Sequence, residues 1–361
     1  MTIDTETNMF RTITFAQAIN EALQIAMSND PAVICFGLGV DDPKAIFGTT
    51  KGLKDQFGPD RVWDMPTSEN AMTGIAIGAS LQGIRPVMVH QRLEFFLLAM
   101  DQLVNNAAKW HYMFGGQRSV PITIRLILGR GWGQGPTHSQ SLHAWFTHIP
   151  GLKVVMPTTP ADARGLLLAS IADPNPVVFL EHRWLHNMLG DVDTTAKCTQ
   201  LGKAGIPRHG SDLTIVSMGY MTIEALHAAD FLKLHGIQCE VIDLRTISPL
   251  DWPTVMASTR KTGRLLALDT GALTGSVAGE VVARVSQECW GDLKCAPARI
   301  AMPDVPEPTS FGMTRNFHPG AEQIVNTASA MLAKDVLACT LAQQRNQQLH
   351  DVPDTWFTGP F

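Results

Sequence analysis

Residues 153–181, KVVMPTTPADARGLLLASIADPNPVVFLE, place two short apolar runs on either side of a longer segment that is rich in small residues. The two runs, KVVMP and PVVFLE, contain several Val residues and have the length of strands. Short apolar runs that alternate with longer segments are expected where the strands of a parallel sheet alternate with helices. The stretch therefore predicts two parallel strands, each buried on both faces, with a helix between them.

The same alternation extends toward the N-terminus. Three more runs have the composition of buried strands: AVICFG (32–37), RPVMVH (85–90) and PITIRLIL (121–128). We therefore expect residues 12–190 to form a first α/β domain.

A second α/β unit follows a polar segment, 191–212, which contains Gly and Pro and reads as a linker. Its strand candidates are LTIVSMG, CEVIDLR, RLLALD and ARIAMPD, with helical segments between them. We predict an α/β protein with two open, mostly parallel sheets flanked by helices, the second and smaller one within residues 213–336. The tail, 337–361, lies outside the pattern; it either wraps a neighbouring subunit or is loose.

The composition limits the class of protein. Of the 361 residues, 45% are hydrophobic and only 17% are charged, and the low charged fraction favours an oligomer. The formal net charge of -5 comes without a basic run, so nucleic acid is not an expected partner. There is neither an apolar stretch long enough to span a membrane nor a signal-peptide pattern, and the six scattered cysteines lack a C-x-x-C pair. We expect a cytoplasmic protein with reduced cysteines.

Common cofactor and metal motifs do not match. The run GRGWGQG (129–135) does not fit G-x-G-x-x-G, and neither a P-loop nor a G-x-S-x-G elbow occurs. His138, His143 and His148 are five residues apart, so they cannot share one face of a helix, and there is no H-E-x-x-H. A metalloenzyme or a serine hydrolase is therefore disfavoured.

Four blocks of sequence carry a resemblance to a known family. They are MPTSENAMTGIAIGASLQGIRPVM (65–88), AMDQLVNNAAKWHYMFGG (99–116), GPTHSQSLHAWFTHIPGLKVVMPTTPADARGLL (135–167) and ADPNPVVFLEHRWL (172–185). Together they resemble the β subunit of the decarboxylating component of pyruvate, branched-chain 2-oxo acid and acetoin dehydrogenase complexes. The resemblance covers roughly residues 12–335. It implies a pyrimidine-binding domain followed by a transketolase C-terminal-like domain, with thiamin diphosphate as the cofactor.

The resemblance also implies site residues. Glu69 would share a proton with the ring nitrogen of the cofactor's aminopyrimidine, although an acid at a helix start is ordinarily explained by the helix dipole. Phe95 would stack on the pyrimidine, with Phe96 as an alternative, and His138 would act near the substrate carboxylate and the lipoyl group. Asp173 and Asn175 match a turn that encloses a monovalent cation such as K⁺ in relatives, but D-P-N-P is also an ordinary turn.

Two departures from the family pattern concern substrate and partners. His90 and Arg92 follow the R-P-V strand, and Trp132 lies in a loop expected nearby, so we expect an anionic substrate group rather than simple pyruvate. No G-D-G motif is present to hold Mg²⁺ and the diphosphate. An α subunit is therefore expected to bring them. Gly74 and Gly78 lie one turn apart in a helix, which indicates close packing either within the domain or against a second β subunit in an α2β2 heterotetramer.

Three functions remain open at this point. The leading one is oxidative decarboxylation of a 2-oxo acid with acyl transfer to a lipoyl acyltransferase component. The alternatives are an acetoin-cleaving or split transketolase-like lyase or transferase subunit, and a non-catalytic scaffold subunit. The acceptor molecule distinguishes the first two.

Overall fold

A seven-stranded sheet forms the centre of the first domain. The computed structural model describes residues 10–42, 44–131, 133–195, 197–314, 317–336, 338, 340–341, 354 and 356–357. Six of the seven strands are parallel, and the seventh, β12, pairs antiparallel with β6 at one edge. In sheet order the strands are β12 (Thr246–Ser248), β6 (Lys153–Val155), β7 (Val177–His182), β5 (Thr123–Leu128), β4 (Arg85–His90), β2 (Val33–Gly37) and β3 (Val62–Asp64).

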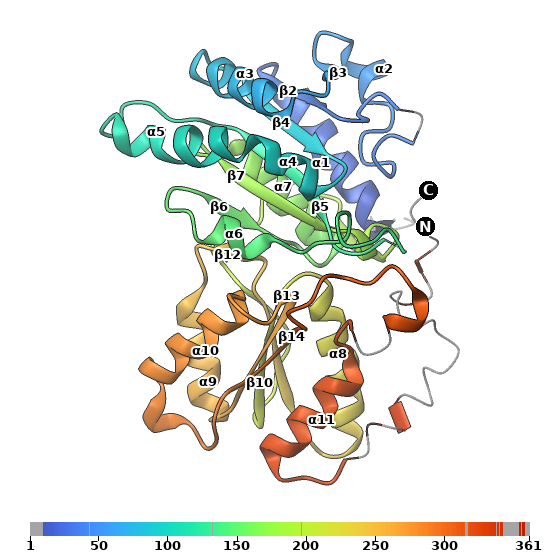
Figure 1. Ribbon diagram of the computed structural model, residues 1–361, viewed down its shortest axis with the longest axis vertical. Coiled ribbons are helices and arrows are strands. Elements are labelled where there is room, and N and C mark those ends of the chain that lie inside the picture. The colour runs from blue at the N-terminus through green and yellow to red at the C-terminus, as the bar shows by residue number, and fades with distance from the viewer. Residues whose placement is uncertain are drawn as a thin grey trace, which may run out of the picture.

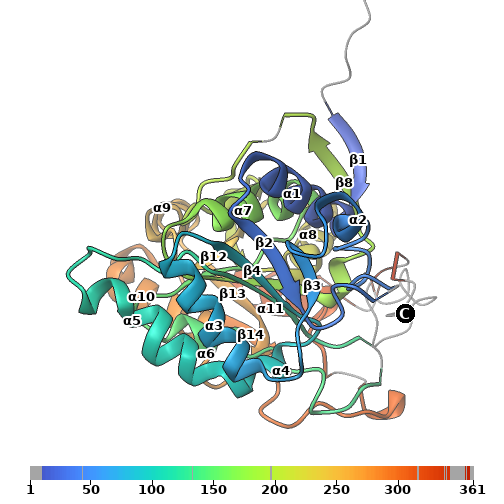
Figure 2. The same ribbon diagram turned by 90° about the horizontal axis from the view of Figure 1, so that it is seen from above.

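Helices cover both faces of this sheet, and Figure 2 shows the two layers with the sheet between them. One layer holds α1 (Phe15–Asn29) and α7 (Pro160–Ala172). The other holds α3 (Glu69–Leu81), α4 (Leu93–Phe96), η1 (Leu97–Ala99), η2 (Gln102–Ala107), α5 (Ala108–Met113) and α6 (His143–Thr147). Because both faces are covered, β5 and β7 are buried along their whole length, as the continuous apolar runs predicted.

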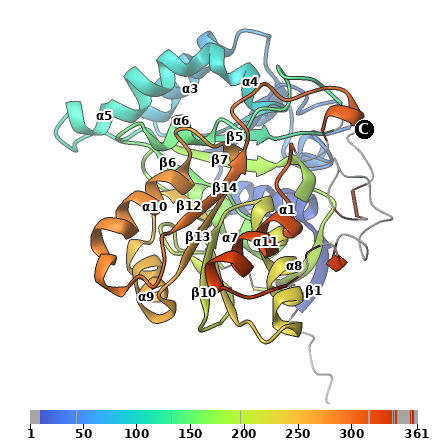
Figure 3. The same cartoon turned by 60° about the horizontal axis from the view of Figure 1, so that its bottom comes forward.

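The second domain contains a five-stranded sheet below the first in Figure 1. Its strands, in sheet order, are β14 (Ala298–Met302), β13 (Leu265–Ala272), β10 (Leu213–Ser217), β11 (Cys239–Asp243) and β9 (Gly205–Arg208). The helices α8 (Tyr220–Leu234) and α11 (Ala321–Leu332) cover one face, and α9 (Trp252–Thr262) and α10 (Val277–Glu288) cover the other (Figure 3). The remaining helical segments are α2 (Leu53–Phe57), η3 (Arg183–Leu185), η4 (Trp290–Asp292) and η5 (Phe311–Met313). The predicted fold class, with two mostly parallel open sheets, is confirmed.

Helix starts follow ordinary capping chemistry. The hydroxyl of Thr14 accepts from the backbone N–H of Gln17, whose side chain accepts from the backbone N–H of Thr14, which forms a capping box at α1. Thr159 caps α7, with Pro160 in its first turn, and Ser276 caps α10. These caps fix where the chain leaves each strand and enters the following helix.

The segment predicted to be a linker contains two short stretches of strand. Residues 191–212 include the end of β8 (Leu189–Asp193), which pairs antiparallel with β1 (Phe10–Thr14), and all of β9. Figure 2 shows β1 and β8 side by side. Both β8 and β9 are short, partly exposed strands at sheet edges, so they lack the apolar run on which strand prediction depends. The domains are therefore connected by edge strands.

The C-terminal tail contacts its own chain where it is described. Trp356 and Phe357 pack against the core cluster of the first domain, and Trp356 Nε1 donates to the carbonyl oxygen of Trp184 at 3.0 Å. These two residues therefore contact the protein's own first domain, and the prediction for the rest of the tail stays a prediction. Most of residues 337–361 lie outside the described part of the chain.

No helix in the described part of the chain is both long enough and apolar enough to span a bilayer.

Candidate active site

The candidate residues follow the carboxyl ends of three strands in the first sheet, β3, β4 and β5. Glu69 begins α3 after β3, Phe95 lies in α4 after β4, and His138 lies in the segment between β5 and α6. In an open parallel sheet, ligands bind in the crevice outside the carboxyl ends of the strands. The fold therefore places at one end of the sheet three residues that the chain separates by up to 69 positions, counted from Glu69 to His138.

Glu69 is a buried acid without a partner among the described residues. Its side chain is in the first turn of α3, the residue is only 4% exposed, and its carboxylate makes no hydrogen bond or ion pair within the described part of the chain. Its backbone carbonyl oxygen accepts from Thr73 Oγ1 at 2.8 Å. Buried polar groups in proteins are nearly always hydrogen-bonded. This carboxyl group therefore fits a partner from outside the chain, such as a ring nitrogen of an aminopyrimidine.

The two neighbouring phenylalanines of α4 have different environments. Phe96 is fully buried, with its ring edge-on to His90 at 5.1 Å and 6.5 Å from the ring of Phe146. Phe95 is partly exposed, and its ring meets the imidazole of His138 in a T-shaped contact at 5.5 Å between centroids. Phe95 is thus the ring that a bound heteroaromatic group would reach.

Two side chains from the α4 region hold the segment that carries His138. Arg92 Nη1 donates to the carbonyl oxygen of His138 at 3.3 Å, and Glu94 Oε1 accepts from the backbone N–H of Gln140 at 2.7 Å. Because both side chains are partly removed from water, the pKa of Arg92 is lowered and the pKa of Glu94 is raised. His138 itself keeps a buried Nδ1 without a hydrogen bond to any described residue. This ring nitrogen is therefore enclosed without a hydrogen bond from the described part of the chain.

His90 lies inside the core rather than on the surface of the site. It is fully buried at the end of β4, and neither ring nitrogen has a hydrogen-bond partner in the described residues. Burial lowers the pKa of His90 to about 4, so the ring is neutral near pH 7. Of the two residues expected to bind an anionic group, only Arg92 is partly exposed. Trp132, expected nearby, lies outside the described residues.

Asp173 and Asn175 lie at the amino ends of the strands, in the turn between α7 and β7. The Asp173 carboxylate accepts from the backbone N–H of Asn175 at 2.9 Å and from Lys153 Nζ at 2.7 and 2.6 Å. Arg85 Nη1 donates to the main-chain oxygens of Ile171 at 3.0 Å and Asp173 at 3.4 Å. Two side-chain cations therefore already bind oxygens of this turn. In the described part of the chain, no cluster of three or more His, Cys, Asp or Glu side chains is arranged to hold a metal ion.

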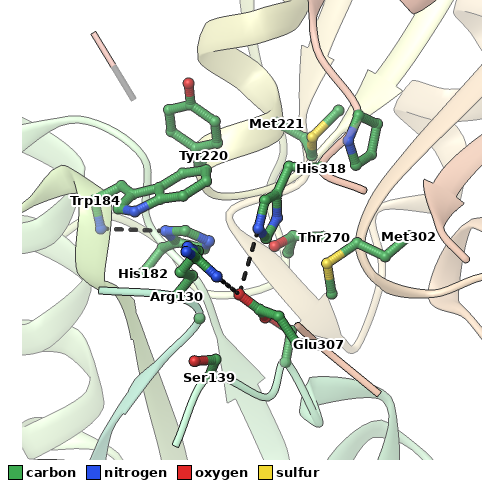
Figure 4. A pocket seen from close by; sticks show the side chains of 13 residues that line it. Arg130, Ser139, His182, Trp184, Tyr220, Met221, Thr270, Met302, Glu307 and His318 are labelled. Atoms are coloured by element: carbon green, nitrogen blue, oxygen red, sulfur yellow. Dashed lines mark hydrogen bonds and ion pairs between the residues drawn. The ribbon is translucent and has the colours of Figure 1, made fainter. Parts of the chain in front are cut away.

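Sequence reasoning missed a second group of polar residues, which lies between the domains close to the His138 segment (Figure 4). Arg130 and Ser139 come from the first domain, and Glu307 and His318 come from the segment between β14 and α11. Only the position of Arg130, next to the glycines of GRGWGQG, gave any signal. Nothing in the sequence relates it to residue 307.

Comparisons with known proteins agree with the fold. Residues 11–187 match the family described as transketolase, pyrimidine binding domain, and residues 202–324 match transketolase, C-terminal domain. A solved structure of a split gene transketolase, described as an inactive beta4 tetramer, has a TM-score of 0.72 and 20% identity, with 89% of this chain and 98% of that chain covered. At that identity it supports the fold alone.

Three relatives are much closer in sequence. The β subunit of acetoin:2,6-dichlorophenolindophenol oxidoreductase from Cupriavidus necator is 41% identical, covering 89% of this chain and 97% of its own. The pyruvate dehydrogenase E1 subunit beta-1 of Oryza sativa is 42% identical (88% and 86%), and the E1 β subunit of Bacillus subtilis is 39% identical (89% and 98%). The chain belongs to the family of transketolase-like β subunits that includes those of pyruvate dehydrogenase E1 and acetoin oxidoreductase.

Proposed function

We propose that the chain is the β subunit of a thiamin-diphosphate-dependent 2-oxo acid dehydrogenase and supplies the pyrimidine half of a shared active site. The observation that carries the proposal is Glu69, a residue that is almost completely buried and whose carboxylate has no partner among the described residues. Glu69 is the first residue of α3 and lies at the carboxyl end of the sheet, as do Phe95 and His138, whose rings are in contact. Membership of the family makes this carboxyl group the expected partner of the cofactor.

When bound, thiamin diphosphate supplies the carbon nucleophile that attacks the 2-oxo group of the substrate. The chain's residues support that chemistry. Glu69 would hold a proton at the pyrimidine ring nitrogen, and Phe95 would provide an aromatic surface for the pyrimidine ring. His138 donates a hydrogen bond to the substrate carboxylate and, later, acts on the incoming acyl acceptor. The hydrogen bonds from Arg92 and to Glu94 keep the segment around His138 in place.

The site is divided between two chains in this proposal. The sequence contains no G-D-G motif for Mg²⁺, and a diphosphate buried without a cation would be strongly disfavoured. An α subunit therefore brings Mg²⁺ and the diphosphate-binding half. Potassium at the Asp173 turn remains a prediction, although Arg85 and Lys153 already provide positive charge there.

The surface of α3 supports a contact between two β subunits. Ala71, Ile75 and Gly78 are exposed on one face of the helix, and a Cβ atom added at Gly78 would meet nothing within 4 Å. The glycine is therefore not required by packing within the domain. A smooth, apolar helix face of this kind suits close approach of a second β subunit. An α2β2 heterotetramer follows from one such contact and two α to β contacts.

Calorimetric titration tests the divided site. Thiamin diphosphate with Mg²⁺ is titrated into the isolated chain and then into its mixture with an α subunit that contains G-D-G. We expect binding and turnover only in the mixture. Micromolar binding with turnover by the isolated chain would overturn the proposal.

The acceptor then separates dehydrogenase from other thiamin chemistry. Reduction of a lipoyl domain by the complex in the presence of a 2-oxo acid supports oxidative decarboxylation with transfer to an acyltransferase component. Cleavage of acetoin, or ketol transfer to an aldehyde without lipoyl reduction, supports the alternative. Binding of the α subunit without turnover on any of these substrates would indicate a scaffold subunit.

A further inference from the structure

A small cavity lies between the two domains, directly beside the segment that carries His138. Figure 4 shows Arg130 and Ser139 on one side of it and Glu307 and His318 on the other. The volume of the cavity is about 20 Å³. That volume holds about one ordered water molecule.

Glu307 connects the two domains through buried polar contacts. Its Oε1 atom accepts from Arg130 Nη1 at 3.3 Å and lies 3.3 Å from His318 Nε2. Arg130 Nη1 also donates to the carbonyl oxygen of Pro308 at 2.8 Å. Arg130 and Glu307 are almost completely buried. Charged groups in such a position interact strongly, because little water screens them.

The backbone on both sides of His138 also contacts the second domain. A Cβ atom added at Gly133 would lie 3.4 Å from the carbonyl oxygen of Thr309, and one at Gly135 would lie 2.9 Å from its hydroxyl. After His138, His143 Nε2 lies 2.9 Å from Asp269 Oδ1, and both side chains are fully buried. The segment that carries His138 is therefore held by the second domain before and after His138.

Several residues on the cavity wall carry a buried polar atom that makes no hydrogen bond to a described residue. Two of these atoms are Ser139 Oγ, from the residue directly after His138, and Glu307 Oε2. Both are buried, and both residues line the same water-sized cavity. A water molecule between them would satisfy the two atoms with hydrogen bonds nearly as favourable as a direct one.

We propose that Glu307 is a positioning residue: it fixes the segment that carries His138 through its contact with Arg130 and through an ordered water bound to Ser139. The inference rests on the proposed function in one respect, the role of His138 at the reacting atoms. The second domain contributes none of the residues expected to contact cofactor or substrate. Through Glu307 it nevertheless sets the position of His138.

Hydrogen exchange followed by mass spectrometry tests the contact directly, in the full chain with its α subunit. Glu307→Gln keeps the size of the side chain but removes its charge, and amides in peptides from 129–142 should exchange about tenfold faster, since a charge-assisted hydrogen bond is weakened. Glu307→Asp keeps the charge and should restore part of the protection. Glu280→Gln removes an exposed acid from the same domain and should leave exchange in 129–142 unchanged.

Ser139→Ala tests the bridging water through a double-mutant cycle. If one water links the two side chains, the double variant with Glu307→Gln exchanges no faster than the faster single variant. If the increase in exchange rate in the double variant equals the product of the increases in the two single variants, the water bridge is overturned. Unchanged exchange in Glu307→Gln would overturn the positioning role.

Kinetics separate this inference from the proposed function. A displaced His138 should lower kcat more than it raises KM, because orientation matters most in the transition state, and should alter the pH profile of kcat/KM. Faster exchange with unchanged kinetics would uphold the contact and would count against a catalytic role of His138. Unchanged exchange with lowered kcat would overturn the positioning role while leaving the proposed function intact.

Discussion

Replacing Glu69 with glutamine is expected to abolish turnover while the fold remains intact. The amide has nearly the same size, and the bond from Thr73 to the backbone carbonyl of residue 69 does not involve the side chain. The carboxylate has no partner among the described residues, so its removal leaves no other group unpaired. The only expected cost is its favourable position at the N-terminus of α3, about 0.3 to 1 kcal/mol. The free energy of unfolding should therefore change by less than about 1 kcal/mol.

The effect on the reaction should be far larger. An amide cannot share a proton with the pyrimidine ring nitrogen, and loss of acid or base assistance costs about a hundredfold or more in rate. Loss of a charge-assisted hydrogen bond should also weaken thiamin diphosphate binding by about tenfold or more. Urea unfolding, calorimetry and turnover of the complex with its α subunit measure the three quantities, with Glu280→Gln as the control for loss of an acid. Turnover within a few-fold of the unmodified protein, or a large loss of stability, would refute the reasoning.

Three further predictions concern other residues. Arg92→Ala should raise KM about tenfold more for a 2-oxo acid with a second carboxylate than for pyruvate, and an equal loss for both substrates would contradict anion binding. Glu181→Gln should cost about 3 to 5 kcal/mol in urea unfolding, because Arg125, which donates to Glu181 at 2.6 and 3.0 Å, is left buried without its counter-charge; a cost below about 1 kcal/mol would exclude that. Burial and the nearby charge of Asp162 raise the pKa of Asp243 to about 7 from 3.8. A raised pKa gives stability at low pH that is lost as the pH rises toward and through about 7, up to about 4 kcal/mol. The free energy of unfolding of Asp243→Asn, relative to that of the unmodified protein, should therefore be higher at pH 9 than at pH 5. The same difference between the two proteins at both pH values would contradict this.

The central strands were predictable because burial leaves a direct mark on the sequence. β4, β5 and β7 are buried along nearly their full length, and each appears as a run made mostly of apolar or β-branched residues. β3, β9 and β12 were missed, because they have three or four residues each and lie at sheet edges. A strand that short carries too few residues for either an alternating or a continuous pattern.

The candidate site was predictable only where a motif identified it. Glu69, Phe95 and His138 came from the family resemblance, and the structure places them at one strand edge. The surroundings of each side chain were not predictable. That His90 is buried while Arg92 is partly exposed depends on how β4 ends against α4, and the contact between Arg130 and Glu307 joins residues 177 positions apart. Such pairings depend on tertiary packing, on which local sequence patterns carry no information.

The position of β12 has a consequence for how the protein can be made. This strand comes from beyond the second domain's first helix, yet it completes the edge of the first domain's sheet beside β6. A ribosome must therefore synthesise residues 1–248 before the N-terminal sheet can close, and until then β6 presents unpaired backbone groups to other chains. Genes cut between the two domains would yield a first half with that edge permanently open, which would tend to aggregate. Evolution by exchange of whole domains is constrained in the same way, since a new second domain would need to bring its own β12.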